Sequence, residues 1–405
     1  MKTILYILII TVSLLLLFEL LTQPQIMRNE NTQLDPAIST SSLSQVQAEP
    51  QEDVDEPEAE DVVTDNLDEQ NIRTVLSAPK DGMYFGAFAD FGPNEKNVTR
   101  RKIKNFEALT GRKISWAYFS QNWFDGIIFP QQTVALLADM NITPYIRLMP
   151  RSNFSSSSTA QRFTLDRIIS GEFDSELRRW AMAAASAETP LIIEFGTEVN
   201  GDWFPWNGAH NGAGTDNEYG SSTQPDGPER FIDAHRRVIN IFREADASNV
   251  TWVYHVNAIS SPSASWNQVM SYYPGDDYID WIGVSVYGAQ TKKARWVSFD
   301  QVFSSAYATV TERTDKPIAI VEVGVSEGSD KNMKAQWFED MFSSLTTGQY
   351  PEVKALAYWH SHFTTADGLT ANLFINSSPS AQAAFKKYIA DPIFLSDTIF
   401  IQVAG

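Results

Sequence analysis

Short apolar runs and longer amphipathic segments alternate along the chain from Met83 onward. Each unit has a run rich in Val, Ile, Tyr and Phe, then a polar or aromatic loop, then a segment whose apolar residues have helical spacing. The runs are MYFGAFAD, ISWAYFSQ, ITPYIRLMP, LIIEFGTE, VTWVYHVN, IDWIGVSVYG, PIAIVEVGVS and VKALAYWHS. The helical segments include 97–109, 131–139, 175–187, 228–245, 299–313 and 331–344, and a closing helix is expected at 380–391.

Eight strands that alternate with helices over about 320 residues have the order and size of a (β/α)8 barrel, an α/β fold. A doubly wound open sheet is the main alternative, but neither a GxGxxG motif nor a P-loop follows any of the strands. The pattern therefore predicts a single (β/α)8 TIM barrel, which we assign to residues 77–405.

The first residues, MKTILYILIITVSLLLLFELL, form an apolar run preceded by Lys2. Its length lies between that of a secretory signal and a minimal membrane span, and no small-residue cleavage pattern follows. Residues 1–22 are thus predicted to be a signal peptide or, preferably, an uncleaved signal anchor. We expect an exported protein that is membrane-anchored and faces outside, or is secreted.

Residues 23–76 are rich in Ser, Thr, Gln and Pro and then in acids, and we predict a disordered acidic linker. The first 71 residues hold fourteen acids and two bases; since the whole chain has a formal charge of −19, the remainder carries −7. This mild charge makes nucleic acid an improbable partner and a neutral ligand plausible. There is no cysteine, which excludes disulfides and thiolate metal sites.

Two glutamates stand at predicted strand ends: the fourth strand ends in Glu198 and the seventh in Glu322. Active sites of such barrels lie at the carboxyl ends of the strands. Strand alternation places Glu194 and Glu198 on one face, so both strand-end carboxylates can point over the barrel mouth. Paired carboxylates are what hydrolysis of a glycosidic bond requires, because one protonates the leaving oxygen while the other attacks or activates water.

Aromatic residues at the strand ends support a sugar ligand, because sugar rings present apolar faces. Trp203 and Trp206 follow Glu198, and Trp123, Tyr287 and Trp359 lie at other strand ends. The alternative is that these side chains belong to the core or the rim of the barrel.

His360 and His362 form an HxH pair, and His255 lies near another strand end. Such histidines raise the alternative of a metal site. No third ligand has a recognised spacing, so we predict no metal site and no cofactor. We expect His360 and Asn257 to contact sugar hydroxyls instead.

Four segments resemble glycoside hydrolase family 26. GTEVNGDWFPWNG is similar to the acid/base motif of that family, KPIAIVEVGVS to its nucleophile strand, YPGDDYIDWIGVSVYG to its sixth strand, and ALAYWHS to its eighth. The resemblance extends from Met83 to about Asp391. It implies a (β/α)8 barrel and a retaining, endo-acting enzyme; most members are β-mannanases and some act on mixed-linkage β-glucan or β-1,3-xylan.

Carried over by residue, the resemblance makes Glu198 the general acid/base and Glu322 the nucleophile. It makes Asn200 and Gly201 shape the turn that presents the tryptophans, and it places Tyr287 beside the nucleophile. Glu198 must then carry a proton at the working pH, whereas Glu322 must stay ionised through its hydrogen bonds.

Two positions depart from the family pattern. Thr197 stands where many members have His, and Glu194 where they often have Arg. An unpaired carboxylate inside a barrel is costly, so Glu194 is predicted to meet a cation, with Arg147 on the third strand the best candidate. The Thr197 change puts mannan specificity in doubt more than hydrolysis.

The combined hypothesis is a monomeric retaining endo-β-glycanase with a polysaccharide as its partner. A carbohydrate-binding barrel without turnover and a transglycosylase remain alternatives. The long loop 207–231 is read either as a substrate flap or as a plain surface loop, and Asp226 as the cap of the following helix.

Overall fold

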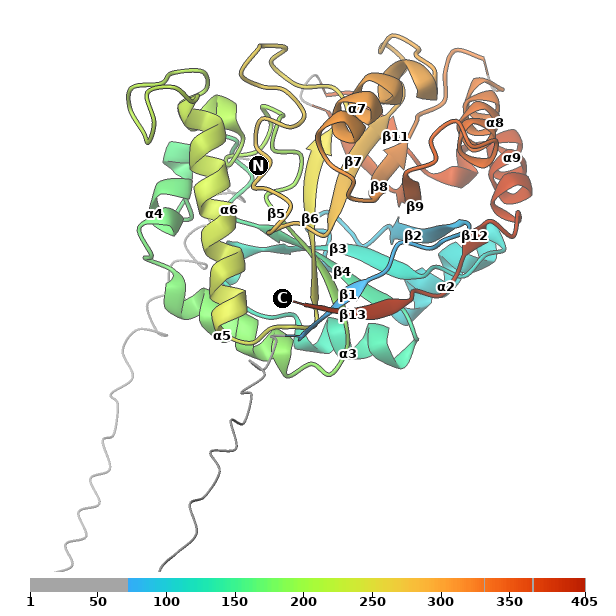
Figure 1. The fold of residues 1–405 in the computed structure, drawn as a ribbon. Coiled ribbons are helices and arrows are strands. Elements are labelled where there is room, and N and C mark those ends of the chain that lie inside the picture. Colours follow the sequence, from blue (N-terminus) through green and yellow to red (C-terminus); the bar gives the residue numbers. More distant parts are fainter. Residues whose placement is uncertain (1–71, 331, 366–367, 405) are drawn as a thin grey trace, which may run out of the picture. The chain divides into compact units, whose positions relative to one another are not determined.

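The computed structural model describes residues 72–330, 332–365 and 368–404. Eight parallel strands pair in chain order, and pairing of the last with the first closes the barrel (Figure 1). They are β2 (Met83–Ala89), β3 (Trp116–Asn122), β4 (Thr143–Met149), β5 (Leu191–Phe195), β6 (Val250–Asn257), β7 (Trp281–Tyr287), β8 (Ile318–Gly324) and β9 (Val353–His360). The predicted (β/α)8 barrel is confirmed, and the open sheet is wrong.

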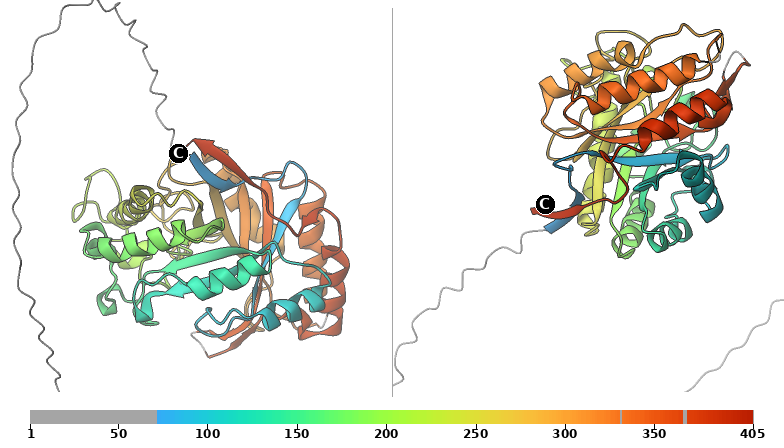
Figure 2. Two further views of the ribbon diagram at one scale, coloured as in Figure 1. Left: turned by 90° about the horizontal axis from the view of Figure 1, so that it is seen from below. Right: turned by 90° about the vertical axis from the view of Figure 1, so that its right-hand side faces the viewer.

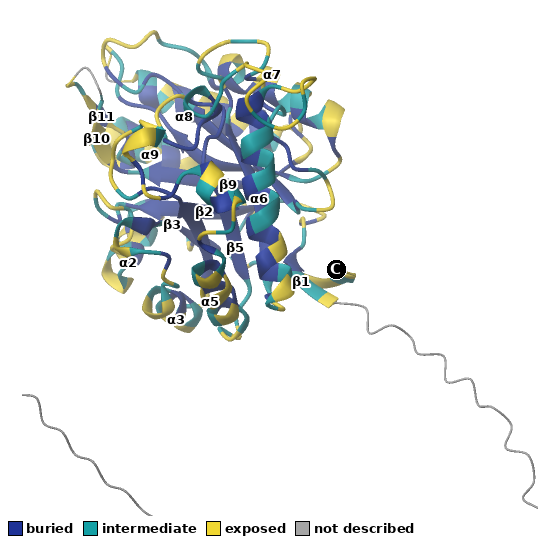
Figure 3. Ribbon diagram, turned by 90° about the vertical axis from the view of Figure 1, so that its left-hand side faces the viewer, coloured by how far each residue is buried: buried dark blue, intermediate teal, exposed yellow. Residues whose placement is uncertain are grey.

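Helices lie on the outside of the strands (Figure 2). They are α2 (Arg100–Thr110), α3 (Gln131–Asp139), α4 (Leu165–Ile169), α5 (Asp174–Ala185), α6 (Asp226–Glu244), α7 (Phe299–Arg313), α8 (Met333–Thr346) and α9 (Pro379–Ile389). The barrel strands are buried, whereas the outer faces of α2, α3 and α5 are exposed (Figure 3). Covering both faces of a parallel sheet explains why its strands read as continuous apolar runs.

Local sequence signals define several helix ends. Ser298 and Gln301 form a capping box at the start of α7, whose bounds match the predicted helix 299–313. At α6 the prediction was wrong, because Pro225 precedes the first turn and Asp226 does not cap it. The Asp226 carboxylate instead accepts a hydrogen bond of 2.6 Å from Thr215 and so fastens the preceding loop.

A small antiparallel sheet joins both ends of the described chain, where β1 (Ile72–Leu76) pairs with β13 (Phe400–Ala404). This two-stranded sheet contacts the start of β7. Arg73 forms a 2.6 Å ion pair with Asp280, and the Trp281 indole donates to the Leu76 carbonyl at 2.9 Å. The predicted disordered linker includes residues 72–76. Because these residues form a strand, this part of the prediction is wrong.

The predicted leader 1–22 and residues 23–71 of the predicted linker lie outside the described residues. In the part of the chain that is described, no helix combines the length and apolar character needed to cross a bilayer.

Candidate active site

Glu198 lies just beyond β5, on a turn that two left-handed residues create. Gly196 has φ of +64° and Glu198 itself has φ of +49°. A side chain at Gly196 would come within 2.7 Å of the Phe231 ring, so glycine is required there. The turn ends the strand alternation before Glu198, and this residue is therefore aimed by loop geometry and not by the face of β5.

Glu322 lies within β8, opposite Ser285 of β7, where the register of the two strands shifts. Its carboxylate accepts hydrogen bonds from Tyr287 at 2.6 Å and from Tyr118 at 3.1 Å. Arg147 lies 3.2 Å from the same group. Burial nevertheless raises the pKa of Glu322 to about 7, although Arg147, His255 and Tyr287 oppose this effect. Arg147 and the hydrogen bond from Tyr287 favour the ionised form, whereas burial opposes it, and the role of Glu322 stays a prediction.

Both glutamates line one cleft of about 570 Å3 at the carboxyl ends of the strands. The other lining residues are Phe88, Gly92, Pro93, Glu95, Arg147, Arg151, Phe154, Trp203, Phe204, Asn257, Tyr287, Gln290, Trp359, Ser361, His362, Phe363, Thr364 and Thr365. One wall comes from β10 (His362–Thr364), which pairs with β11 (Thr370–Asn372). The cleft is where the barrel architecture predicts an active site.

Glu198 has a different set of partners from Glu322. The Trp203 indole donates to one carboxylate oxygen at 2.8 Å, and the Asn257 amide donates to the other at 2.9 Å. Both donors are neutral, whereas Glu322 is held by a cation. The two carboxylates thus occupy the same cleft in different electrostatic environments, which is how a protein separates an acid from a nucleophile.

The predicted partner of Glu194 is confirmed. Arg147 lies 3.4 Å from the buried Glu194 carboxylate, which also accepts from Tyr145 at 2.7 Å and Tyr118 at 3.0 Å. His255 lies 3.0 Å from it as well. Burial alone would raise the pKa of Glu194, but His255, Arg147 and Tyr145 lower it overall.

His255 connects this buried cluster to Thr197. Its Nδ1 lies 2.6 Å from the Thr197 hydroxyl, and its Nε2 lies 2.8 Å from the Ser285 hydroxyl. Burial lowers the pKa of His255, but the neighbouring carboxylates, Glu194 first, raise it overall. Thr197 is completely buried and therefore points into the barrel and not toward the cleft.

Some members of the site were not found from the sequence. Glu95, in a loop with φ of +56°, accepts from Arg147 at 2.9 Å and from Ser120 at 2.5 Å. Tyr118 bonds to both Glu194 and Glu322 from the middle of β3. A signal existed for Tyr118, because a polar group inside a buried parallel strand requires a buried partner.

Four of the predicted substrate-binding residues lie in the cleft: Trp203, Tyr287, Trp359 and Asn257. Trp203 is 38% exposed, so its ring is available to a ligand. Trp359 is largely buried and stacks on Phe88 with ring centroids 4.0 Å apart. Their contacts with a sugar stay predictions.

The other four do not line the cleft. Trp123 is fully buried against Phe163, and Trp206 is 1% exposed and donates to the Thr197 carbonyl. The Asn200 amide accepts from the Asn257 backbone and thereby supports that residue. His360 accepts from a backbone N–H, and burial lowers its pKa to about 3. The structure thus gives these four supporting positions below the cleft surface.

Loop 207–225 does not contribute to the cleft lining either, which favours the plain surface loop over the flap. The side chains of His, Asp and Glu in the described parts of the chain form no group of three that could hold a metal ion.

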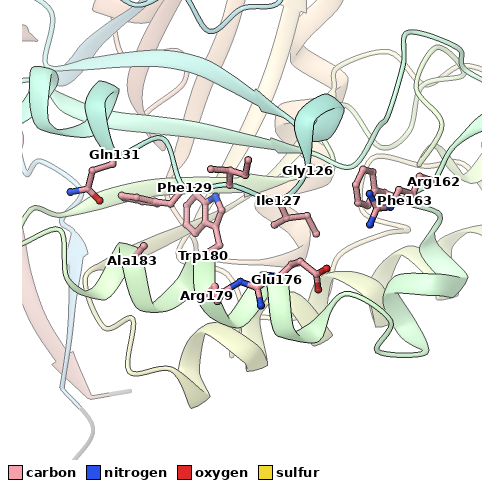
Figure 4. Close-up of a pocket in the computed structure, with 11 residues that line it drawn as sticks. Gly126, Ile127, Phe129, Gln131, Arg162, Phe163, Glu176, Arg179, Trp180 and Ala183 are labelled. Atoms are coloured by element: carbon pink, nitrogen blue, oxygen red, sulfur yellow. The ribbon is translucent and has the colours of Figure 1, made fainter. Parts of the chain in front are cut away.

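A second hollow of about 420 Å3 lies on the flank of the barrel, between the 126–131 loop and α5 (Figure 4). Arg162, Glu176, Arg179 and Trp180 line it. It shares no lining residue with the cleft, so the paired carboxylates define the candidate active site.

Comparison with known proteins agrees with this geometry. Residues 158–346, which include Glu198 and Glu322, match the model of glycosyl hydrolase family 26. This part of the barrel is therefore similar to glycosyl hydrolase family 26. Three of the four motifs lie within the matched residues, whereas ALAYWHS at 355–361 lies beyond them.

The chain is also similar to proteins that are named for several activities. Endoglucanase H of Acetivibrio thermocellus is 29% identical over 314 residues, which cover 76% of this chain and 30% of that protein. Beta-1,3-xylanase TXYA of a Vibrio species is 22% identical over 263 residues, covering 59% and 52%. The chain therefore spans well under two thirds of the length of either relative.

Solved β-mannanase structures share the fold of this barrel. The enzyme from Bacteroides ovatus aligns with a TM-score of 0.54 and 15% identity, covering 78% of this chain and 91% of that one. At this identity the likeness establishes the barrel and not the substrate.

Proposed function

We propose that this chain is a retaining, endo-acting β-glycanase in which Glu198 is the acid/base and Glu322 the nucleophile. The observation that carries the proposal is the pair of carboxylates in one cleft with different partners: an indole and an amide on Glu198, a cation and two phenols on Glu322. Similarity to the family supports the same chemistry.

The reaction proceeds in two displacements. A carboxylate oxygen of Glu322 attacks the anomeric carbon, the glycosidic C–O bond breaks, and Glu198 gives its proton to the leaving oxygen. Glu198 then takes a proton from water, the water oxygen attacks the anomeric carbon, and the Glu322 carboxylate leaves. Tyr287 and Arg147 hold Glu322 in place and favour its ionised form.

Exposed aromatic rings around the cleft support binding of an extended polymer. Phe154, Trp203 and Phe363 are 61%, 38% and 36% exposed and all line it. Two come from loops and Phe363 comes from β10, so successive sugar units have several stacking surfaces. The activities for which the similar proteins are named indicate a β-linked glucan, xylan or mannan. Thr197 is buried and does not line the cleft, which argues against a contact between this side chain and mannan.

A carbohydrate-binding barrel without turnover is disfavoured because such a protein does not need both glutamates. Transfer of the glycosyl unit to a second sugar instead of water uses the same residues and stays a possible outcome of the reaction. Export, membrane attachment through residues 1–22 and a monomeric state stay predictions.

The proposal is tested by incubating the purified protein with mannan, mixed-linkage β-glucan, β-1,3-xylan and cellulose. We expect new reducing ends from one polymer, together with a rapid fall in viscosity that marks internal cleavage. Proton NMR of the first product should show the β-anomer, which then mutarotates. Initial appearance of the α-anomer would contradict retention, and binding without release of ends would favour the binding barrel.

The pH dependence of kcat/KM should have an acid limb near pH 7. Glu322 must be ionised to attack, and burial raises its pKa to about 7, so activity falls as the pH drops below this value. In Tyr287→Phe the carboxylate loses a hydrogen bond that favours its charged form, and the limb should move to higher pH. A wild-type limb below about pH 5, near an ordinary carboxyl value, would contradict this assignment.

A further inference from the structure

Arg151, which follows β4, lies in the cleft wall without a carboxylate partner. It is 6% exposed, and its Nε donates to the Asn122 side-chain oxygen at 2.5 Å. Its Nη1 and Nη2 form no hydrogen bond with any described residue. These two nitrogens remain accessible to solvent. Because Arg151 lines the cleft, we infer that they face it.

Aromatic rings surround the Arg151 guanidinium. Its central carbon lies 4.9 Å from the ring centre of Phe154, 5.4 Å from that of Phe204 and 5.7 Å from that of Phe124. Cation–π contacts of this kind hold the group in place, but an aromatic ring provides no lone pair for its N–H donors. The side chain is thus fixed while two adjacent donors stay available.

The neighbouring Arg147 shows what a satisfied cation looks like in the same cleft. It contacts the carboxylates of Glu95, Glu194 and Glu322. Arg151 forms no such ion pair, and burial lowers its pKa to about 10 although the charge of Glu95 opposes this effect. A buried cation without a directly paired carboxylate destabilises the fold, so its presence in a ligand cleft indicates a role in binding.

We propose that Arg151 binds a carboxylate of the substrate, so that the polymer is an acidic β-glycan with a uronic acid, or a carboxylate-bearing substituent, near the scissile bond. Two adjacent guanidinium N–H groups match the two oxygens of a carboxylate, and charge-assisted pairs of this type are the strongest that Arg forms. This inference rests on the proposed function of the same cleft.

Placement of Arg151 links the acid group to the catalytic centre. Phe204, which contacts its guanidinium, belongs to the same loop as Trp203, and Trp203 donates to Glu198. A carboxylate on Arg151 therefore lies on the Glu198 side of the cleft. The net charge of −7 outside the first 71 residues favoured a neutral ligand, but net charge governs long-range attraction and not recognition by one buried group.

The test compares polymers that differ only in charge: mannan, mixed-linkage β-glucan and β-1,3-glucan, each with and without partial oxidation of C6 to a carboxylate. The wild type should prefer one oxidised polymer by at least about 10-fold in kcat/KM, which is the size of a charge-assisted hydrogen bond. Arg151→Met should lose about 10- to 100-fold more on that polymer than on its uncharged partner. Arg151→Lys keeps the charge without the paired donors and should retain part of the preference.

Arg162→Met is the matched control, because Arg162 also contacts phenylalanine rings but lines the flank hollow. It should preserve the preference. Calorimetry of Glu322→Ala, with and without Arg151→Met, measures binding to the same polymers and separates the two proposals. If the oxidised polymer binds only when Arg151 is present but the wild type does not cleave it, the glycanase proposal fails and the acid-binding role stands. Three results would overturn the acid-binding role: equal turnover or binding of the oxidised and uncharged polymers, equal losses of kcat/KM on the two polymers in Arg151→Met, or no binding of any oxidised polymer. Arg151 would then contact neutral hydroxyls or only pack against its neighbours.

Discussion

Glu322→Ala is expected to lower kcat/KM on the preferred polymer by about 10⁴-fold or more, because no group remains to form the covalent intermediate. The variant should fold, since Tyr118, Tyr287 and Arg147 lose a buried carboxylate and not a packed apolar side chain. Reducing-end release measures the loss, and circular dichroism verifies the fold. Glu327→Ala is the matched control: this glutamate follows the same strand but accepts from Ser377 outside the cleft, and its variant should stay active.

Azide distinguishes the two glutamates. In Glu322→Ala the small anion fits the space of the lost carboxylate and attacks the anomeric carbon of an activated aryl β-glycoside, which gives an α-glycosyl azide. In Glu198→Ala the covalent intermediate still forms, and azide attacks it in place of water to give a β-glycosyl azide. Exchanged products, or no rescue of either variant while both are folded, would show that the roles are assigned wrongly.

The fold was predictable wherever the signal was local. Barrel strands are covered on both faces, so their apolar runs stand out, and helices such as α7 begin at recognisable caps. Strand β1 was missed because its partner β13 lies more than 300 residues away, and five residues beside an acidic stretch show no pattern until they pair. Asp226 was misread because a carboxylate before a helix can fasten a loop as well as a backbone turn.

The sequence was sufficient to predict the chemistry of the candidate site. It was less informative about which side chains face the cleft. Strand ends identified Glu198 and Glu322, and the cost of burying a charge identified Arg147 for Glu194. The left-handed backbone at Gly196 and Glu198 redirects everything that follows β5, so alternation could not show that Trp206 turns inward while Trp203 stays exposed. Residues that reach the cleft from loops, such as those near Glu95, have no periodic signal at all.

Arg147→Met should destabilise the protein by about 3–5 kcal/mol at pH 8 and abolish measurable turnover. Arg147 is the shared counter-ion of three carboxylates, and removing one side of a buried ion cluster leaves charges without compensation. The pKa of Glu322 should rise further, because Arg147 is the strongest influence that lowers it. A carboxyl whose folded pKa is raised stabilises the fold below its unfolded value and loses that contribution as the pH rises, so the defect should shrink toward pH 5.

Denaturant unfolding at pH 5 and pH 8 measures this, and a double variant shows where the energy lies. Glu194→Gln added to Arg147→Met removes one uncompensated carboxylate and should recover about 1–3 kcal/mol, which is a direct coupling between the two strands. Arg178→Met, which breaks an exposed pair with Glu244, should cause no measurable loss. If Arg147→Met were as stable as Arg178→Met, or if the double variant were no better than the single one, the buried cluster would not be the framework that holds the nucleophile, and Tyr118 and Tyr287 alone would have to position Glu322.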